Sequence, residues 1–210
     1  MEDVLVLYEM PYDARYPTVC LDEKPVMLHG EVHAGLPPAS GHVERRDYEY
    51  ERHGTANLFV MVEPLAGWRH VGVTAQRTKQ DYAECLRELV EERYREADRI
   101  YLVQDNLNTH TAGALYETFA PGQARAILDR LEFHPTPKHA SWLNQAEIEI
   151  SVFERGCLSR PVPDTATLEQ RVRALEVERN ARHATIEWQF TARQARVKLK
   201  QLYPVAQPPA

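Results

Sequence analysis

Two aspartates follow short apolar runs, where an α/β sheet commonly presents its reactive side chains. Asp22 comes after the run at residues 19–21, and Asp105 follows the run at residues 100–103 and one glutamine. Ligands of open α/β sheets bind beyond the carboxyl ends of the strands, so the two carboxylates are expected to meet there. Close carboxylates repel one another and need a cation, and Mg²⁺ or Mn²⁺ prefers oxygen ligands. The pair therefore predicts a divalent-metal site, while the ordinary alternative is that each aspartate caps a turn or helix.

A third acid is expected from a helix that begins near Ser141 and runs to about Leu158. Its apolar stripe consists of Trp142, Ala146, Ile150, Phe153 and Cys157. At about 100° per residue, Glu147 and Glu149 flank this stripe on opposite sides. Either glutamate can face the sheet, and periodicity does not choose between them.

Other kinds of site lack their usual motifs. The sequence contains no His-Glu-x-x-His, no Gly-x-Ser-x-Gly and no glycine-rich nucleotide loop. The three cysteines are far apart and predict reduced thiols in the cytoplasm. No apolar run approaches the 18 residues of a membrane span, and the acidic first residues do not suggest a signal peptide.

Charge is unevenly distributed along the 210 residues. The whole chain carries 25 Lys and Arg against 31 Asp and Glu, a net charge of −6. Residues 1–149 hold 15 of these basic and 25 of these acidic residues, so residues 150–210 have a positive balance. The net negative charge argues against a protein that coats nucleic acids in general, although the positive later part of the chain could face an anion.

The hydrophobic pattern around the acids has the period of a strand in some segments and of a helix in others. A strand at residues 19–22 is expected to be kept short by Pro25, and residues 30–46 are typical of a loop. An antiparallel meander is expected from strands at 47–51, 57–63 and 68–74, with turns at 52–55 and 64–67. An amphipathic helix over 79–98 and a buried strand at 100–103 follow.

The remainder is predicted to be mostly helical. Helices are expected at 110–119 and 121–131, followed by a short strand at 131–134. Asp164 is a suitable N-cap for a helix to about Arg182, and Thr191 with Gln194 forms a capping box for the last helix. This order predicts an α/β fold, with a mixed sheet flanked by helices and a helical C-terminal extension.

Three sequence blocks contain the candidate acids. They read Leu-Asp-Glu-Lys-Pro at 21–25, Val-Gln-Asp-Asn-Leu-Asn-Thr-His at 103–110 and Thr-Pro-Lys-His-Ala-Ser-Trp-Leu-Asn-Gln-Ala-Glu at 136–147. In this order and spacing they resemble the catalytic blocks of DDE transposases, specifically the bacterial insertion-sequence branch of the mariner superfamily. The resemblance extends from about Tyr8 to Tyr203. It implies a ribonuclease-H-like fold, with an antiparallel meander and parallel strands in one sheet.

The resemblance also assigns roles to the acids. It implies that Asp22, Asp105 and Glu147 bind two Mg²⁺ or Mn²⁺ ions, and the Leu-Asn-x-x-Glu pattern selects Glu147 over Glu149. The implied activity is cleavage of double-stranded DNA at transposon ends, followed by strand transfer into target DNA. The implied protein is a homodimer on DNA, located in the cytoplasm beside the bacterial nucleoid.

Further residues in the blocks have expected supporting roles. Asn106, His110 and Asn144 are expected to support the metal geometry or the scissile strand. The expected DNA contacts are Lys138, His139 and Trp142, although a helix start for His139 and core packing for Trp142 are open alternatives.

Two features depart from the family pattern. Gln104 stands where relatives carry an aliphatic residue and is expected to soften the strand beside Asp105. Only 21 residues precede Asp22, too few for the helix-turn-helix modules of relatives, so a separate polypeptide is a possible source of them. We therefore expect a catalytic core at 1–160, a helical extension at 161–203 and a tail at 204–210. The alternatives are an idle remnant or partner subunit of a split transposase, and a metal hydrolase acting on small phosphoesters.

Overall fold

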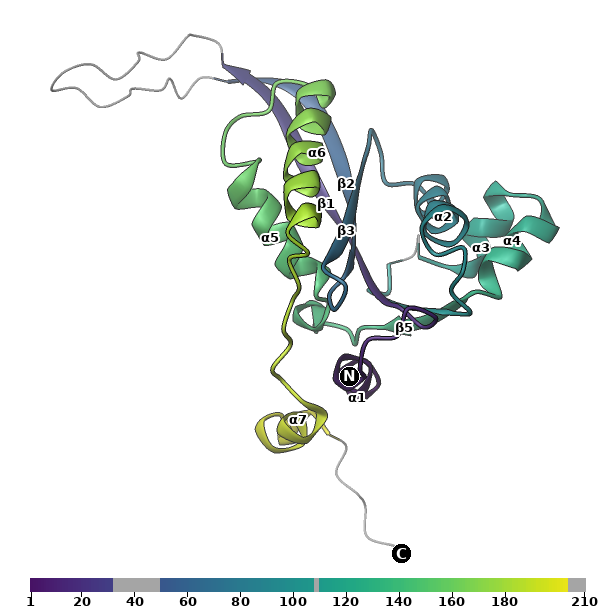
Figure 1. The fold of residues 1–210 in the computed structure, drawn as a ribbon. Coiled ribbons are helices and arrows are strands. Elements are labelled where there is room, and N and C mark those ends of the chain that lie inside the picture. The colour runs from purple at the N-terminus through teal and green to yellow at the C-terminus, as the bar shows by residue number, and fades with distance from the viewer. Residues whose placement is uncertain (32–49, 108–109, 204–210) are drawn as a thin grey trace, which may run out of the picture.

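The computed structural model describes residues 1–31, 50–107 and 110–203. A five-stranded mixed sheet runs through it in the order β3-β2-β1-β4-β5 (Figure 1). The first three strands are antiparallel, while β4 and β5 continue the sheet in parallel from β1. The strands are β1 (Thr18–Glu31), β2 (Tyr50–Glu63), β3 (Trp68–Thr74), β4 (Ile100–Gln104) and β5 (Leu131–Pro135).

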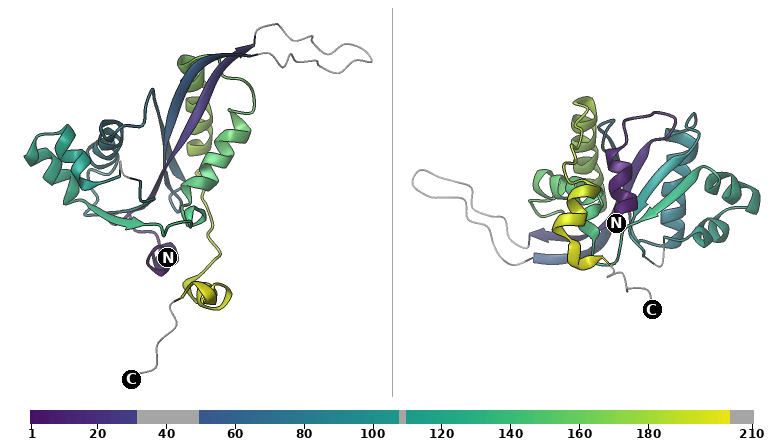
Figure 2. Two further views of the ribbon diagram at one scale, coloured as in Figure 1. Left: turned by 180° about the vertical axis from the view of Figure 1, so that it is seen from behind. Right: turned by 90° about the horizontal axis from the view of Figure 1, so that it is seen from below.

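Helices cover both faces of this sheet, as Figures 1 and 2 show. One face packs on α2 (Lys79–Arg87), its π-helical continuation Glu88–Arg93, α3 (Ala112–Thr118) and α4 (Pro121–Leu128). The other face packs on α5 (Ala146–Gly156) and α6 (Thr165–Ala181). A third cluster joins the sheet to α1 (Glu2–Glu9) and α7 (Ala192–Lys198). Short 3₁₀ turns lie at Ser141–Leu143 and Lys200–Leu202. This arrangement confirms the predicted mixed sheet flanked by helices.

The faces of β1 follow the two-residue period of a strand. Val19 and Leu21 are buried against α2 and its neighbours, whereas Cys20 joins the opposite cluster. The alternation continues through the acids, so Asp22 and Glu23 leave β1 toward opposite faces. Asp22 and Glu23 therefore face different helices.

Local capping signals place three helices as predicted. The Thr78 hydroxyl accepts a hydrogen bond from the Asp81 amide in a capping box that begins α2. Asp164 accepts from the Thr167 amide and caps α6. Thr191 begins α7 with its predicted capping box, which satisfies amides that would otherwise lack partners.

The strand lengths in the first part of the sheet were predicted wrongly. β1 runs for 14 residues through Pro25, which pairs with Asn57 of β2. β4 pairs with β1 only at Thr18–Cys20, so the later part of β1 has an open edge, where a proline without an N–H is tolerated. The expected turn at 52–55 is strand within β2, and Gly54 takes φ +105° there beside an irregularity in the register. The meander is therefore β1-β2-β3.

Two helices also differ from expectation. The helix expected from Ser141 starts with an isolated 3₁₀ turn, and α5 begins only at Ala146. The helix expected over 79–98 changes to π-helical turns at Glu88 and ends at Arg93. Helix α1 was not predicted. Residues 32–46 of the expected loop, residues 47–49 of an expected strand and the tail 204–210 lie outside the described residues. Within the described part, no helix is long and apolar enough to cross a membrane.

Candidate catalytic carboxylate site

The first two acids lie at equivalent points of neighbouring parallel strands. Cys20 of β1 pairs with Val103 of β4, and Asp22 and Asp105 each follow two residues later. β4 ends at Gln104, so Asp105 belongs to the loop at its carboxyl end, while β1 continues past Asp22. The sheet therefore brings these two predicted site residues to one place, as the strand-end argument anticipated.

Glu147 lies in the first turn of α5, on the side of the sheet that Asp22 faces. Burial, together with the negative charges of Glu147 and Asp105, raises the pKa of Asp22 to about 7, against the opposing effect of a hydrogen bond from the Glu23 amide. The three acids are thus close enough to influence one another electrostatically. At neutral pH their repulsion is relieved either by a proton on Asp22 or by a bound cation.

Asn144 connects the first acid to the helix that carries the third. Its side-chain amide donates to the Leu21 carbonyl at 2.8 Å and to Asp22 Oδ2 at 3.1 Å. Its Oδ1 accepts a hydrogen bond from the Ala146 amide at 3.2 Å, at the start of α5. Asn144 therefore orients Asp22 and holds the first turn of α5 against β1.

Glu149 is committed to a different group of charges. Its side chain is fully buried and lies 3.1 Å from Arg69 Nε, measured at Oε1. Arg179 donates to both carboxylate oxygens of Glu149, at 2.5 Å and 3.0 Å. Asn180 completes the group by bonding the Arg69 backbone. These contacts join β3, α5 and α6. Both carboxylate oxygens of Glu149 are therefore engaged with arginines and are not directed to Asp22 or Asp105.

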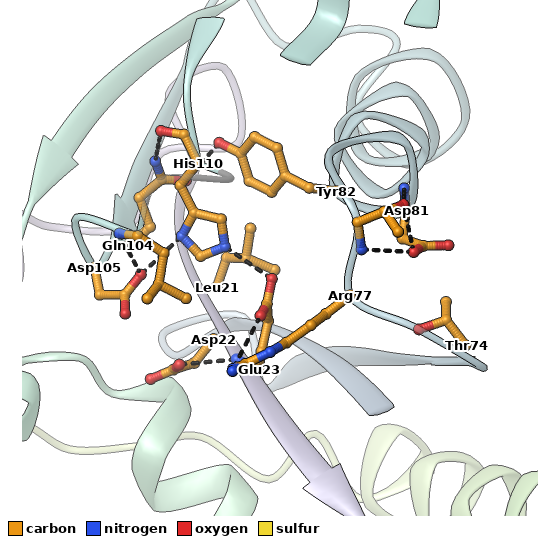
Figure 3. Close-up of polar contacts among 12 residues, drawn as sticks. Leu21, Asp22, Glu23, Thr74, Arg77, Asp81, Tyr82, Gln104, Asp105 and His110 are labelled. Carbon is orange, nitrogen blue, oxygen red and sulfur yellow. Dashed lines mark hydrogen bonds and ion pairs between the residues drawn. The ribbon is translucent and has the colours of Figure 1, made fainter. Parts of the chain in front are cut away.

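A buried histidine lies between the second acid and a fourth carboxylate (Figure 3). His110 Nδ1 is 2.7 Å from Asp105 Oδ1, and His110 Nε2 is 2.9 Å from Glu23 Oε1. Burial opposes a charge on His110, but the contacts with Asp105 and Glu23 outweigh it and raise the pKa of the imidazole to about 9. The pKa of Asp105 is lowered despite partial burial, because His110 stabilises its charged form.

Gln104 is part of the same arrangement, contrary to the expectation that it softens the strand. Its Oε1 accepts the Tyr82 hydroxyl at 2.7 Å, and its Nε2 donates to the His110 carbonyl at 3.4 Å. The Tyr82 ring also stacks on the His110 ring at 4.5 Å between centroids. A polar residue at the end of β4 is therefore fully bonded and helps to fix His110.

The remaining predicted residues occupy the loop between β5 and α5 and the loop after β4. The Asn106 amide donates to the Thr136 carbonyl at 2.9 Å and ties these two loops together. Lys138 and His139 are exposed, and His139 has φ +64°, which excludes it from a helix start. Trp142 is 45% exposed and does not pack in the core.

Sequence reasoning missed Glu23 and the partners of Glu149. The signal for Glu23 was present, since it directly follows Asp22 and must face the opposite side of a strand. Nothing local indicated Arg69 and Arg179, which come from other elements.

The donor set suits a hard divalent cation. Asp22, Asp105 and Glu147 supply only carboxylate oxygens, and burial first, then the charges of the other two acids, disfavours a charged Asp22 in the absence of a cation. Among the residues that the structure describes, however, no three acidic, histidine or cysteine side chains are already placed as a metal cage. The three carboxylates fit the metal by the chemistry of their donor atoms.

Comparison with known proteins agrees with this arrangement. A family model described as DDE superfamily endonuclease matches residues 17–169, which include all three acids. Comparison with curated proteins gives no match.

Solved structures with a similar fold include three complexes of the Mos1 transposase. They are the mariner paired-end complex with Mn (14% identity, TM-score 0.54), the paired-end complex with left transposon end (14%, 0.56) and the strand transfer complex (13%, 0.57). The matches cover 86%, 87% and 87% of this chain but only 55%, 56% and 55% of the Mos1 chains. The likeness confirms the ribonuclease-H-like fold, and this chain spans about half the length of its structural neighbours.

The predicted relationship to DDE enzymes is thus confirmed at the level of the family, while the bacterial insertion-sequence branch stays a prediction. More than half of the sequence matches the family model, and the matched residues include Asp22, Asp105 and Glu147. The chain belongs to the DDE endonuclease superfamily.

Proposed function

We propose that this chain is the catalytic domain of a DNA transposase that cuts transposon ends and joins them to target DNA. The observation that carries the proposal is that Asp22 and Asp105 follow paired positions of β1 and β4, while Asn144 joins Asp22 to the start of α5, which carries Glu147. In the proposed site Asp22, Asp105 and Glu147 hold two Mg²⁺ or Mn²⁺ ions. Such ions, when bound, activate a water or a 3′-hydroxyl and stabilise the leaving oxygen of a phosphodiester.

The chain's own residues would prepare this site. Asn144 directs Asp22 toward α5, and His110 holds Asp105 from the other side of β1. Because His110 is held in turn by Glu23, Asp105 is fixed by a buried chain of contacts. Partners of this kind maintain the orientation and basicity of metal-binding groups.

DNA is the proposed partner, and exposed groups beside the third acid are its proposed contacts. Lys138, His139 and Trp142 precede Glu147 on a loop and a 3₁₀ turn, where a DNA strand entering the acids would pass. The related Mos1 structures are complexes with transposon ends, which supports this assignment. A homodimer on paired ends, a separate helix-turn-helix polypeptide and a place beside the bacterial nucleoid belong to the same proposal. The same proposal divides the chain into a core at 1–160, an extension at 161–203 and a tail at 204–210.

A nicking assay on short double-stranded DNA tests the proposal. We expect strand cleavage with Mn²⁺, none with EDTA, and loss of cleavage in Asp105→Asn. Asp129→Asn is the matched control, because Asp129 is an exposed partner of Arg125 on α4 and lies outside the site.

The outcomes separate the alternatives. A folded protein that never nicks DNA would support an idle remnant or a partner subunit. Faster turnover of a small chromogenic phosphodiester than of DNA would support a small-molecule hydrolase.

A further inference from the structure

Helix α1, which precedes the residues 17–169 of the family match, places one side chain beside the acids. Tyr8 of α1 donates its hydroxyl proton to the Leu143 carbonyl at 2.7 Å, across 135 positions of the sequence. The same oxygen lies 3.3 Å from the Sγ atom of Cys20, which precedes Asp22 by two residues on β1. Burial raises the pKa of the Cys20 thiol to about 11, so at neutral pH the thiol keeps its proton and donates it to the Tyr8 oxygen. The hydroxyl therefore joins β1 to the turn before α5.

The Leu143 carbonyl is close to the proposed metal ligands. Leu143 directly precedes Asn144, whose side chain contacts Asp22 and the first amide of α5. The Glu147 amide donates to the Asn144 carbonyl at 3.1 Å, which leaves the Leu143 carbonyl to the Tyr8 hydroxyl. A displacement of Leu143 would move Asn144 and change the spacing between Asp22 and Glu147.

Helix α1 is itself anchored, so the Tyr8 hydroxyl has a fixed position. Asp3 Oδ2 lies 2.7 Å from His134 Nδ1 of β5, near the start of the helix. At its end, Glu9 accepts the Ala192 amide of α7 at 2.7 Å, and Figure 2 shows α1 beside α7. The apolar side of α1 packs in the same buried cluster as the turn before α5. The contact with that turn therefore comes from a rigid part of the molecule.

Building on the proposed function, we propose that Tyr8 is a positioning residue for the metal-binding acids and acts through Leu143 and Asn144. Its hydroxyl fixes the start of α5, which carries Glu147, relative to the strand that carries Asp22. The working site therefore includes α1, which lies outside the residues that the family model matches. Partners that only orient metal ligands typically change metal affinity by about 10- to 100-fold.

Thermal unfolding of the full-length chain in a Mn²⁺ titration, without DNA, tests this role. An ion that binds only the folded protein raises the Tm, so the titration reports affinity without requiring cleavage. Tyr8→Phe removes the hydroxyl and keeps the ring, and we expect it to need about 10- to 100-fold more Mn²⁺ for the same rise in Tm. Nicking should show the same shift and recover at high Mn²⁺, while DNA binding in EDTA should be unchanged.

Tyr94→Phe is the matched control, because it also removes a buried hydroxyl. The Tyr94 hydroxyl donates to Glu63 Oε2 at 2.6 Å, and Tyr94 belongs to the cluster on the opposite face of the sheet. The Tm of metal-free Tyr94→Phe should fall, but its Mn²⁺ requirement should match that of the unchanged protein. An equal shift in both variants, or no shift in Tyr8→Phe, overturns the proposal.

Cys20→Ala is a second variant, which leaves the contact with Leu143 in place. It removes the thiol that donates to the Tyr8 oxygen, so we expect a smaller shift of the Mn²⁺ requirement in the same direction. No shift in Cys20→Ala would contradict a route through the phenol.

The two proposals fail separately. Nicking whose Mn²⁺ requirement is unaffected by Tyr8→Phe refutes only the positioning role. A shifted Mn²⁺ requirement in a protein that never nicks DNA refutes only the cleavage. A Tm of the unchanged protein that does not respond to Mn²⁺ refutes both.

Discussion

Replacing Glu149 with glutamine should destabilise the protein far more than the same change at Glu147. The Glu149 and Arg69 side chains are both fully buried, and Arg179 adds two contacts to the same carboxylate. Removing one partner of a buried ion pair leaves an uncompensated charge and costs about 3–5 kcal/mol. In a protein of this size that corresponds to a fall in Tm of about 6 to 20 °C.

Glu147→Gln should behave in the opposite way. Glu147 makes no ion pair among the described residues, and its charge repels Asp22, so its removal should change the free energy of unfolding by no more than about 0.5 kcal/mol. Urea unfolding followed by circular dichroism measures both variants. Glu178→Gln is the control for a surface ion pair, which contributes less than about 1 kcal/mol.

Nicking assays complete the comparison. At a temperature where all variants are folded, Glu149→Gln should still cut DNA, whereas Glu147→Gln should not. The reasoning is wrong if Glu149→Gln unfolds within about 1 kcal/mol of the unchanged protein. It is equally wrong if Glu147→Gln keeps its nicking activity.

Three further changes test the electrostatics and the support of the site. The folded pKa of Asp22, about 7, lies above its ordinary value of 3.8, so the metal-free protein should lose stability as pH rises between these values. Asp22→Asn should remove that loss and raise the free energy of unfolding by at least about 1 kcal/mol at pH 8. Thermal unfolding in EDTA measures the difference. The pKa of His70 is raised, first by its hydrogen bond to Glu176 and also by the charges of Glu88 and Glu92, so these contacts should stabilise the fold below about pH 6.5 and lose their effect as pH rises through the folded pKa. Glu176→Gln should weaken this pH dependence in urea unfolding, and an unchanged profile would exclude the Glu176 contact as its main cause. Glu23→Gln should slow nicking by about 10- to 100-fold through His110, with DNA binding retained in a gel-shift assay, and full activity would contradict the supporting role.

The parts of the fold that depend on local signals could be predicted. Asp164 and Thr191 cap helices through amides within three residues, and the apolar run at residues 100–103 is buried on both faces of the sheet. The strand-end position of Asp105 follows from such a run alone. These inferences needed no knowledge of distant residues.

The parts that failed depend on distant partners. The length of β1 is decided by β2, whose pairing carries the strand past Pro25. The carboxylate of Glu149 is held by Arg69 and Arg179, which lie 80 and 30 positions away in the sequence. Helical periodicity places two flanking glutamates but does not contain their partners.

The placement of Asp22 and Glu23 on opposite faces makes the site sensitive to the length of β1. Inserting or deleting one residue between Thr18 and Asp22 would shift the strand by one position and exchange the two carboxylates. Glu23 would then point to α5 and Asp22 to His110, although every side chain would still be present. The first strand must therefore keep its number of residues for the chemistry to survive.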